Sequence, residues 1–165
     1  MTPEFRRDPL HNTWVVFAPK RQRRPQEFGP AIVPSGHLDP FAGGNERLTP
    51  SEVYAIRDPG TKPNEPGWRV RVVPNRYPAM EIEGKLEGNP VALYDHLSGI
   101  GAHEVVIETP DGNTAFDQLP VPVIADILAS YRERINDLDR DLRFQHIPGH
   151  RPGRVRQARS LRGLL

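Results

Sequence analysis

Four cationic side chains follow a short apolar segment near the start of the chain. The segment is Thr13–Phe17, and prolines at positions 19 and 25 flank the basic stretch. The four cations are Lys20, Arg21, Arg23 and Arg24. Guanidinium groups can pair two N–H donors with phosphate oxygens, and flanking prolines lower the conformational entropy lost on binding. This arrangement predicts a diphosphate site, and the alternative interpretation is a solvated basic loop.

The composition limits what else the chain can bind. Among 165 residues, 22 Lys and Arg nearly balance 21 Asp and Glu, so the net charge of +1 offers no global field toward nucleic acid or an anionic membrane. Cysteine is absent, which excludes disulfides and thiolate metal sites from this sequence. The first residues contain no apolar run long enough for a signal peptide or a membrane span. We expect no nucleic-acid partner, no membrane segment and a cytoplasmic location.

Three short segments carry the pattern of β-strands. Thr13–Phe17 is β-branched and aromatic, Trp68–Val72 alternates apolar residues with arginines, and His103–Glu108 contains a run of Val and Ile. Loops rather than helices separate these segments, which favours antiparallel pairing. We therefore expect one sheet, with strands around Val15, Val70 and Val106, and a basic face on the second strand.

The remaining segments divide into loops, one helix and a tail. Residues 25–67 are dense in Pro and Gly and contain only a helix-like piece at Ser51–Ile56. Apolar residues recur every three or four positions from about Val121 to Leu142, which predicts a long helix packed on the sheet. Residues 145–165 are rich in Arg and contain no acid, and we expect a disordered or poorly packed tail. The fold class is therefore α+β.

Four motifs in this order resemble the galactose-1-phosphate uridylyltransferase family and its adenylyl-transferring relatives. They lie within Arg7–Pro25, Asp39–Pro50, Val73–Ala79 and Gly101–Pro110. The resemblance covers roughly residues 5–144, so we divide the chain into an N-terminal-like domain at 1–144 and a tail at 145–165. It implies an incomplete half-barrel of the histidine-triad type. The change in composition after Phe144 suggests a frameshifted or truncated reading frame.

The resemblance also implies a binding site. Arg21 and Arg24 would hold the phosphate or sugar portion of a nucleotide, and Asn75, Arg76 and Tyr77 would line the nucleoside pocket. The apolar wall of that pocket would consist of Phe41, Leu48 and Val105. Two alternatives remain open at this stage: Tyr77 as a core aromatic residue, and Asn75 as the cap of a turn.

Several family features are absent from this sequence. The positions of the family's structural zinc ligands are occupied by Asp39, Ala42 and Gly112, so we expect no metal and no cofactor. The family's nucleophile belongs to an H-x-H-x-Q type motif, and none of the six histidines forms an H-x-H pair. We therefore assign no catalytic residue, and we expect His103, a lone histidine on a strand, to be structural.

The resemblance implies transfer of UMP or AMP between a nucleotide sugar and a hexose 1-phosphate, through a covalent nucleotidyl-histidine. The expected partners are a UDP- or ADP-hexose and a hexose 1-phosphate. If the family's strands after the long helix are missing, apolar surface is left uncovered, and this would favour self-association as a homodimer. The alternatives are a catalytically inactive nucleotide-sugar binder, a non-functional fragment, and an oligonucleotide-binding module that uses the basic loop.

Overall fold

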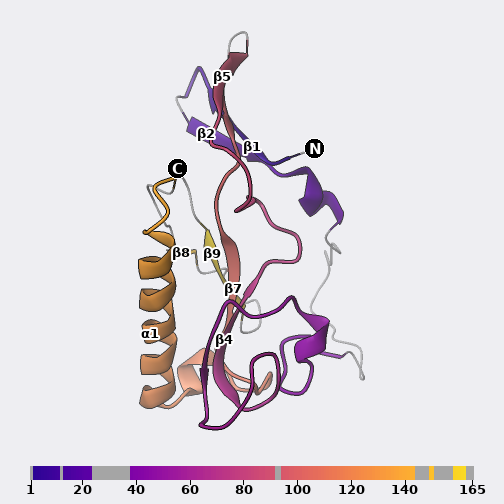
Figure 1. The fold of residues 1–165 in the computed structure, drawn as a ribbon, viewed down its shortest axis with the longest axis vertical. Helices are drawn as coiled ribbons and strands as arrows, with labels where there is room; N and C mark the ends of the chain where they lie inside the picture. Colours follow the sequence, from indigo (N-terminus) through magenta and orange to yellow (C-terminus); the bar gives the residue numbers. More distant parts are fainter. Residues whose placement is uncertain are drawn as a thin grey trace.

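The computed structural model describes residues 2–11, 13–23, 38–91, 94–143, 149–150 and 158–162. Within these ranges the chain forms two antiparallel sheets and one long helix, so the α+β class is confirmed. The first sheet lies at one end of the long axis and the helix flanks the second sheet toward the other end (Figure 1). Arg24 and residues 144–148 lie outside the described ranges.

The first sheet has the strand order β2-β1-β6-β5. Its strands are β1 (Glu4–Asp8), β2 (Thr13–Phe17), β5 (Gly88–Val91) and β6 (Tyr94–Ser98). β1 and β2 pair from Glu4 opposite Phe17 to Asp8 opposite Thr13. All five residues of β2 are exposed, and the strand lies at an edge of this sheet.

The second sheet has the order β3-β4-β7-β9-β8. It consists of β3 (Tyr54–Arg57), β4 (Trp68–Pro74), β7 (His103–Ile107), β8 (Gly149–His150) and β9 (Ala158–Arg162). Three short 3-10 helices lie in the connections: η1 (Pro19–Arg23), η2 (Glu46–Leu48) and η3 (Phe116–Gln118). Backbone strands therefore occur within the tail in which we expected no regular structure.

The expectation of a single sheet was wrong. The strand around Val15 belongs to the first sheet, whereas Val70 and Val106 belong to the second. The physical reason is local: a turn at residues 9–11 follows β1, so pairing of β2 with β1 closes a much shorter loop than pairing with β4 would. Only one of the five residues of β1 is apolar, so the sequence pattern did not predict this strand.

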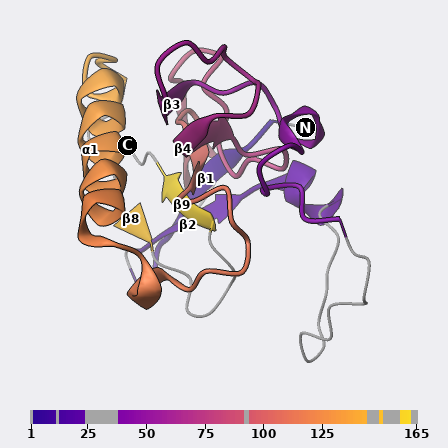
Figure 2. The same ribbon diagram turned by 90° about the horizontal axis from the view of Figure 1, so that it is seen from below.

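The helix α1 (Val121–Leu138) packs on β3 and β4 (Figure 2). Ile127 is fully buried against Val70, Val72 and Val106, which form one core cluster. The helix ends at Leu138 rather than Leu142: the backbone N–H groups of Arg140 and Asp141 donate to carbonyls three residues earlier, at 3.3 and 3.1 Å, and Leu142 is exposed.

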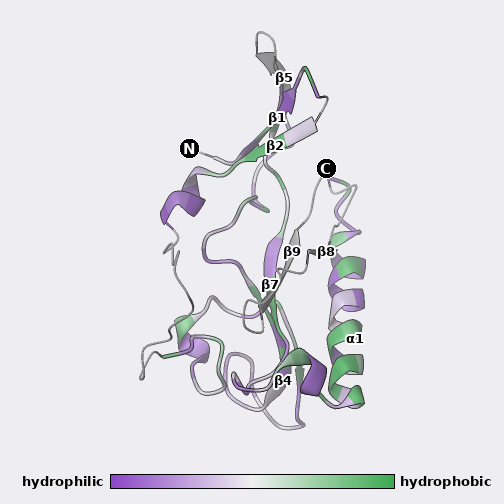
Figure 3. Cartoon of the chain, turned by 180° about the vertical axis from the view of Figure 1, so that it is seen from behind, coloured by the Kyte–Doolittle hydropathy of each residue, from purple (hydrophilic) through white to green (hydrophobic). Residues whose placement is uncertain are grey.

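Hydrophobic residues recur along α1 (Figure 3), but part of the predicted apolar stripe remains in solvent. Leu128 and Ile135 are 59% and 40% exposed. No helix within the described residues is long and apolar enough to cross a membrane.

The segment Ser51–Ile56 does not form a helical turn. Tyr54–Arg57 is the strand β3, which pairs with β4 through Tyr54 opposite Val72 and Ile56 opposite Val70. Both side chains pack against the core cluster under α1. Pairing with β4 and burial of an alternating apolar pair outweigh the weak helical preference of this short segment.

Candidate functional site

The side chains of β7 alternate between two environments. Val106 packs toward α1, and Glu104 on the same face pairs with Arg134 of the helix. His103, Val105 and Ile107 lie on the opposite face, because successive side chains of a strand point to opposite sides of its sheet. The candidate site is built on this second face.

An apolar wall covers part of that face. Trp68 and Val73 of β4 and Val105 and Ile107 of β7 form one buried cluster, and Phe41 packs against it. Two of the three predicted wall residues, Phe41 and Val105, are therefore brought together. Leu48 ends η2, is half-buried and is not part of the cluster.

A buried carboxylate fixes the loop that supplies Phe41. Glu46 is 5% exposed and accepts hydrogen bonds from the indole Nε1 of Trp68 at 2.7 Å and the backbone N–H of Gly44 at 3.0 Å. Burial opposes ionisation of Glu46, but these hydrogen bonds outweigh it and lower the pKa of the carboxyl group. The carboxylate therefore holds residues 44–46 against the indole edge of Trp68.

The turn at Asn75–Ala79 follows β4 and is tied to His103. The backbone N–H of Asn75 donates to the carbonyl of His103 at 2.7 Å, and the N–H of Ala79 donates to His103 Nδ1 at 2.9 Å. Asn75 Oδ1 accepts a hydrogen bond from the N–H of Tyr77 at 2.8 Å. Asn75 therefore does cap a turn, as the alternative interpretation held, while its Nδ2 group faces His103 Nε2 at 3.3 Å.

The basic segment near the start of the chain contacts the same turn. Arg21 of η1 donates from Nη1 to the backbone carbonyl of Tyr77 at 3.4 Å, and Lys20 forms an ion pair with Glu81 at 2.5 Å. Arg21 is half-buried, whereas Arg23 is exposed. The fold thus brings Arg21, Asn75 and Tyr77 together, as a shared binding site requires.

Two other predicted residues are less clearly placed. Arg76 lies in the same turn, but its side chain is exposed. Arg24 lies outside the described residues. Tyr77 is half-buried rather than part of the core, which leaves its ring partly accessible.

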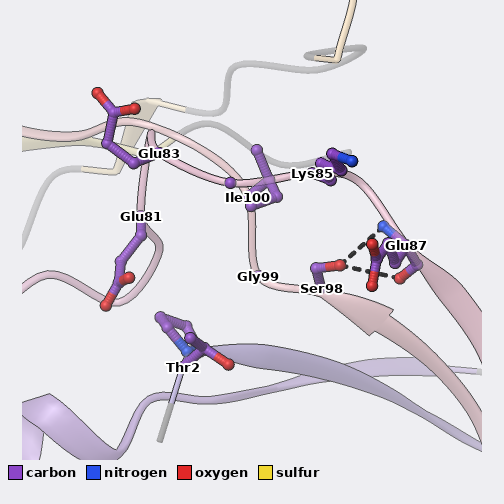
Figure 4. Close-up of a pocket in the computed structure, with 10 residues that line it drawn as sticks. Thr2, Glu81, Glu83, Lys85, Glu87, Ser98, Gly99 and Ile100 are labelled. Atoms are coloured by element: carbon purple, nitrogen blue, oxygen red, sulfur yellow. Dashed lines mark hydrogen bonds between the residues drawn. The ribbon is translucent and has the colours of Figure 1, made fainter.

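A separate hollow lies beside this turn, and none of the predicted site residues lines it (Figure 4). Its charged lining residues are Glu81, Glu83, Lys85 and Glu87. Glu81 is paired with Lys20, and the two further carboxylates against the single ammonium group of Lys85 disfavour a phosphate there by Coulomb repulsion. The side of the turn that faces Arg21 is therefore the candidate anion site.

The residues at the family's zinc positions do not fit a metal. The turn that contains Asp39 and Ala42 is joined to the turn before Gly112 by a hydrogen bond from the Gly43 N–H to the Pro110 carbonyl at 2.9 Å. Ala42 and Gly112 have no donor atom in their side chains, and Asp39 Oδ1 accepts from the Phe41 N–H at 2.9 Å. Among the described residues no group of three or more His, Asp or Glu side chains could hold a metal ion.

Sequence reasoning missed two parts of this region. The role of His103 in holding Asn75–Ala79 was not predicted, although its place at the start of a strand motif was visible. Arg71, expected on a basic face of its strand, is only 1% exposed and donates to Glu52 Oε2 at 2.8 Å and to Thr49 Oγ1 at 2.6 Å. Its partners come from the Pro-rich segment, whose path the strand alternation does not reveal.

The fold and site together define a histidine-triad-like α+β domain with a candidate anion and nucleoside face. Known proteins share this architecture. A uridylyltransferase mutant structure aligns at a TM-score of 0.65 with 20% identity, covering 96% of this chain and 44% of that chain. A GalT-like protein from Arabidopsis thaliana aligns at a TM-score of 0.58 with 27% identity, covering 97% and 46%.

A curated relative, ADP-glucose phosphorylase from Arabidopsis thaliana, is 33% identical over 145 residues. A crystal structure of an ADP-glucose phosphorylase from the same organism with bound ADP-glucose aligns at a TM-score of 0.57 with 27% identity, covering 99% of this chain and 49% of that chain. No protein-family model matches the sequence.

The chain is related to ADP-glucose phosphorylase over most of its own length, and it shares the fold of the GalT-like uridylyltransferase structures. The curated relative is named as a phosphorylase, and the uridylyltransferase structure is a neighbour in fold. The matched region is 83% of this chain but 39% of the curated relative, so the chain spans about two fifths of the length of that protein.

Proposed function

We propose that residues 1–144 form the nucleotide-binding wall of a nucleotidyl-transferring protein that acts on nucleotide sugars. The observation that supports this most strongly is the contact between Arg21 Nη1 and the Tyr77 carbonyl, which links two predicted site segments separated by 56 residues. Arg21 would bind the diphosphate, and Asn75 and Tyr77 would contact the nucleoside. Phe41 and Val105 would supply apolar surface.

The proposed reaction is transfer of UMP or AMP to a hexose 1-phosphate. A histidine nitrogen would form a bond to the α-phosphorus as the bond to the bridging oxygen breaks, releasing a hexose 1-phosphate. An oxygen of a second hexose 1-phosphate would then displace the histidine. We assign no residue of this sequence to the attacking histidine, because the sequence contains no H-x-H pair.

The second candidate function is nucleotide-sugar binding without transfer. It uses the same residues and differs only in the absence of chemistry. ADP-glucose is the first ligand to test, because a relative with 33% identity is named for it. UDP-glucose is the second, since the family includes uridylyltransferases.

Isothermal titration calorimetry with ADP-glucose, UDP-glucose, glucose 1-phosphate and a short single-stranded oligonucleotide would separate these possibilities. We expect saturable binding of at least one nucleotide sugar that weakens little with salt. Binding of only the oligonucleotide, with a steep salt dependence, would contradict the proposal. Exchange of labelled glucose 1-phosphate into the nucleotide sugar would distinguish transfer from binding alone.

A further inference from the structure

We propose that His103 is a positioning residue, which holds the Asn75–Ala79 turn through Nδ1 and leaves the N–H donors of the Asn75 side-chain amide available to a ligand. This inference rests on the proposed function, because it concerns the same turn. His103 is 5% exposed and Ala79 is 7% exposed, so their contact is shielded from water. The hydrogen bond between them joins β7 to the far end of the turn.

The contacts of His103 determine its tautomer. The backbone N–H of Ala79 is only a donor, so Nδ1, 2.9 Å away, must act as an acceptor and carry no proton. A neutral imidazole then carries its proton on Nε2. A doubly protonated ring would place its Nδ1–H against the backbone N–H of Ala79 at 2.9 Å, and this shorter contact is costly because the backbone donor cannot rotate away.

The orientation of the Asn75 amide is determined in the same way. Its Oδ1 accepts from the Tyr77 N–H at 2.8 Å, so the NH₂ group must be the atom that faces His103 Nε2 at 3.3 Å. With a proton on Nε2, this second contact places donor against donor and is not a hydrogen bond. The NH₂ group is thus packed against the ring without using its N–H donors there.

This arrangement points to a specific role for Asn75. One imidazole offers one acceptor, and two donors lie within reach of it: the Ala79 N–H and the Asn75 NH₂. The backbone donor is closer and cannot rotate away, so it takes the acceptor. The Asn75 NH₂, on a half-buried residue, is then available to an acceptor oxygen or nitrogen on the ribose or base of a nucleotide.

Two substitutions at His103 separate this role from simple packing. In His103→Asn the side-chain oxygen can occupy the position of Nδ1 and still accept from Ala79, whereas in His103→Gln it lies near the position of Nε2. We expect His103→Gln to weaken ADP-glucose binding about tenfold, the loss expected for one hydrogen bond. His103→Asn should stay within about threefold of wild type. His11→Gln, at an exposed histidine in the turn after β1, is the matched control.

The experiment has a readout that needs no ligand. Amide hydrogen exchange at Ala79 should be slow in the wild type and in His103→Asn, and fast in His103→Gln. The ¹⁵N spectrum of the His103 ring in the wild-type protein should show a protonated Nε2 and an unprotonated Nδ1, which requires no variant to fold.

The outcomes are distinct. A proton on Nδ1, or equal Ala79 exchange and equal ADP-glucose binding in both variants, would overturn the inference. If the wild type binds no nucleotide sugar while exchange at Ala79 follows the expected order, the positioning by His103 is supported and the proposed function fails.

Discussion

Arg134 of α1 donates two hydrogen bonds to the carboxylate of Glu104 in β7, from Nε at 2.9 Å and from Nη2 at 2.7 Å. Both side chains are less than a tenth exposed. The hydrogen bonds that Arg134 donates to Glu104 raise the pKa of Arg134 above its ordinary value, so the guanidinium stays charged. The pair joins the helix to the strand whose opposite face carries His103 and Val105.

Loss of one partner should destabilise the fold strongly. We expect Arg134→Ala to lower the free energy of unfolding by about 3–5 kcal/mol, because it leaves the Glu104 carboxylate buried and uncompensated. Arg132→Ala, at an exposed pair with Glu133, should change it by less than about 0.5 kcal/mol. Urea unfolding measures both. If both variants lower the free energy of unfolding by the same small amount, the Arg134–Glu104 pair is not desolvated in solution.

Acid should weaken the network around Glu52, which accepts from Arg71 at 2.8 Å and from Arg57 Nη2 at 2.6 and 2.7 Å. Burial opposes ionisation of Glu52, but these hydrogen bonds outweigh it and lower the pKa of the carboxyl group below 4.5. The unfolded chain therefore binds a proton at higher pH than the folded chain. The stability that Glu52 contributes is present above pH 4.5 and is lost as the pH falls through its folded-state pKa.

The measurement is the free energy of unfolding from pH 7 to pH 3 for the wild type and Glu52→Gln. The stability difference between them should narrow below pH 4.5, the ordinary pKa of the group. Asp117→Asn, at an exposed carboxylate, corrects for general charge effects. A difference that stays constant over the whole range would rule out the ionised Glu52 network.

Treatment with a metal chelator should leave the melting temperature of this protein unchanged. Asp39, Ala42 and Gly112 cannot form a tetrahedral site, and the Gly43–Pro110 hydrogen bond already joins the two turns. We expect less than stoichiometric zinc by elemental analysis and the same melting temperature with and without EDTA. One tightly held zinc per chain, with a lower melting temperature after chelation, would contradict this prediction.

Exposed apolar side chains should cause self-association. Trp14, Val15, Val16 and Phe17 of β2 are 38–47% exposed along a sheet edge. Uncharged edge strands favour pairing with other chains. We expect a molar mass that rises with concentration in light scattering, and less so for Val15→Lys. Ala125→Lys adds the same charge on an exposed position of α1 and should not have this effect; equal behaviour of the two variants would exclude β2.

The elements of the fold that could be predicted are those whose sequence pattern is local. The start of α1 at Val121 and the strands Thr13–Phe17 and His103–Ile107 follow from hydrophobic periodicity and flanking turn residues. The division into two sheets was not predictable in this way, because it depends on which strands pair. The end of α1 was missed because the apolar periodicity continues to Leu142, whose side chain is exposed in the structure.

The candidate site was predictable only in part. The motifs supplied Arg21, Asn75 and Tyr77, and their adjacency came from the fold. The role of His103 depends on a contact with Ala79 across 24 residues, and burial of Arg71 depends on the path of a long Pro-rich segment. Neither has a periodic signature, so single-sequence reasoning could not assign them.

Binding of ADP-glucose, followed by Trp68 fluorescence, tests the central claim most directly. Trp68 belongs to the apolar cluster that Phe41 and Val105 share, and Trp14→Phe removes the other of the two tryptophans. In the Trp14→Phe background we predict a saturable change in Trp68 fluorescence as ADP-glucose is added. Arg21→Ala should weaken the affinity for ADP-glucose roughly 10- to 100-fold, the loss expected for hydrogen bonds to a charged group. Arg23→Ala, on the same 3-10 helix but exposed, should bind within about threefold of the parent protein. No saturable change, or equal weakening by both substitutions, would contradict the account.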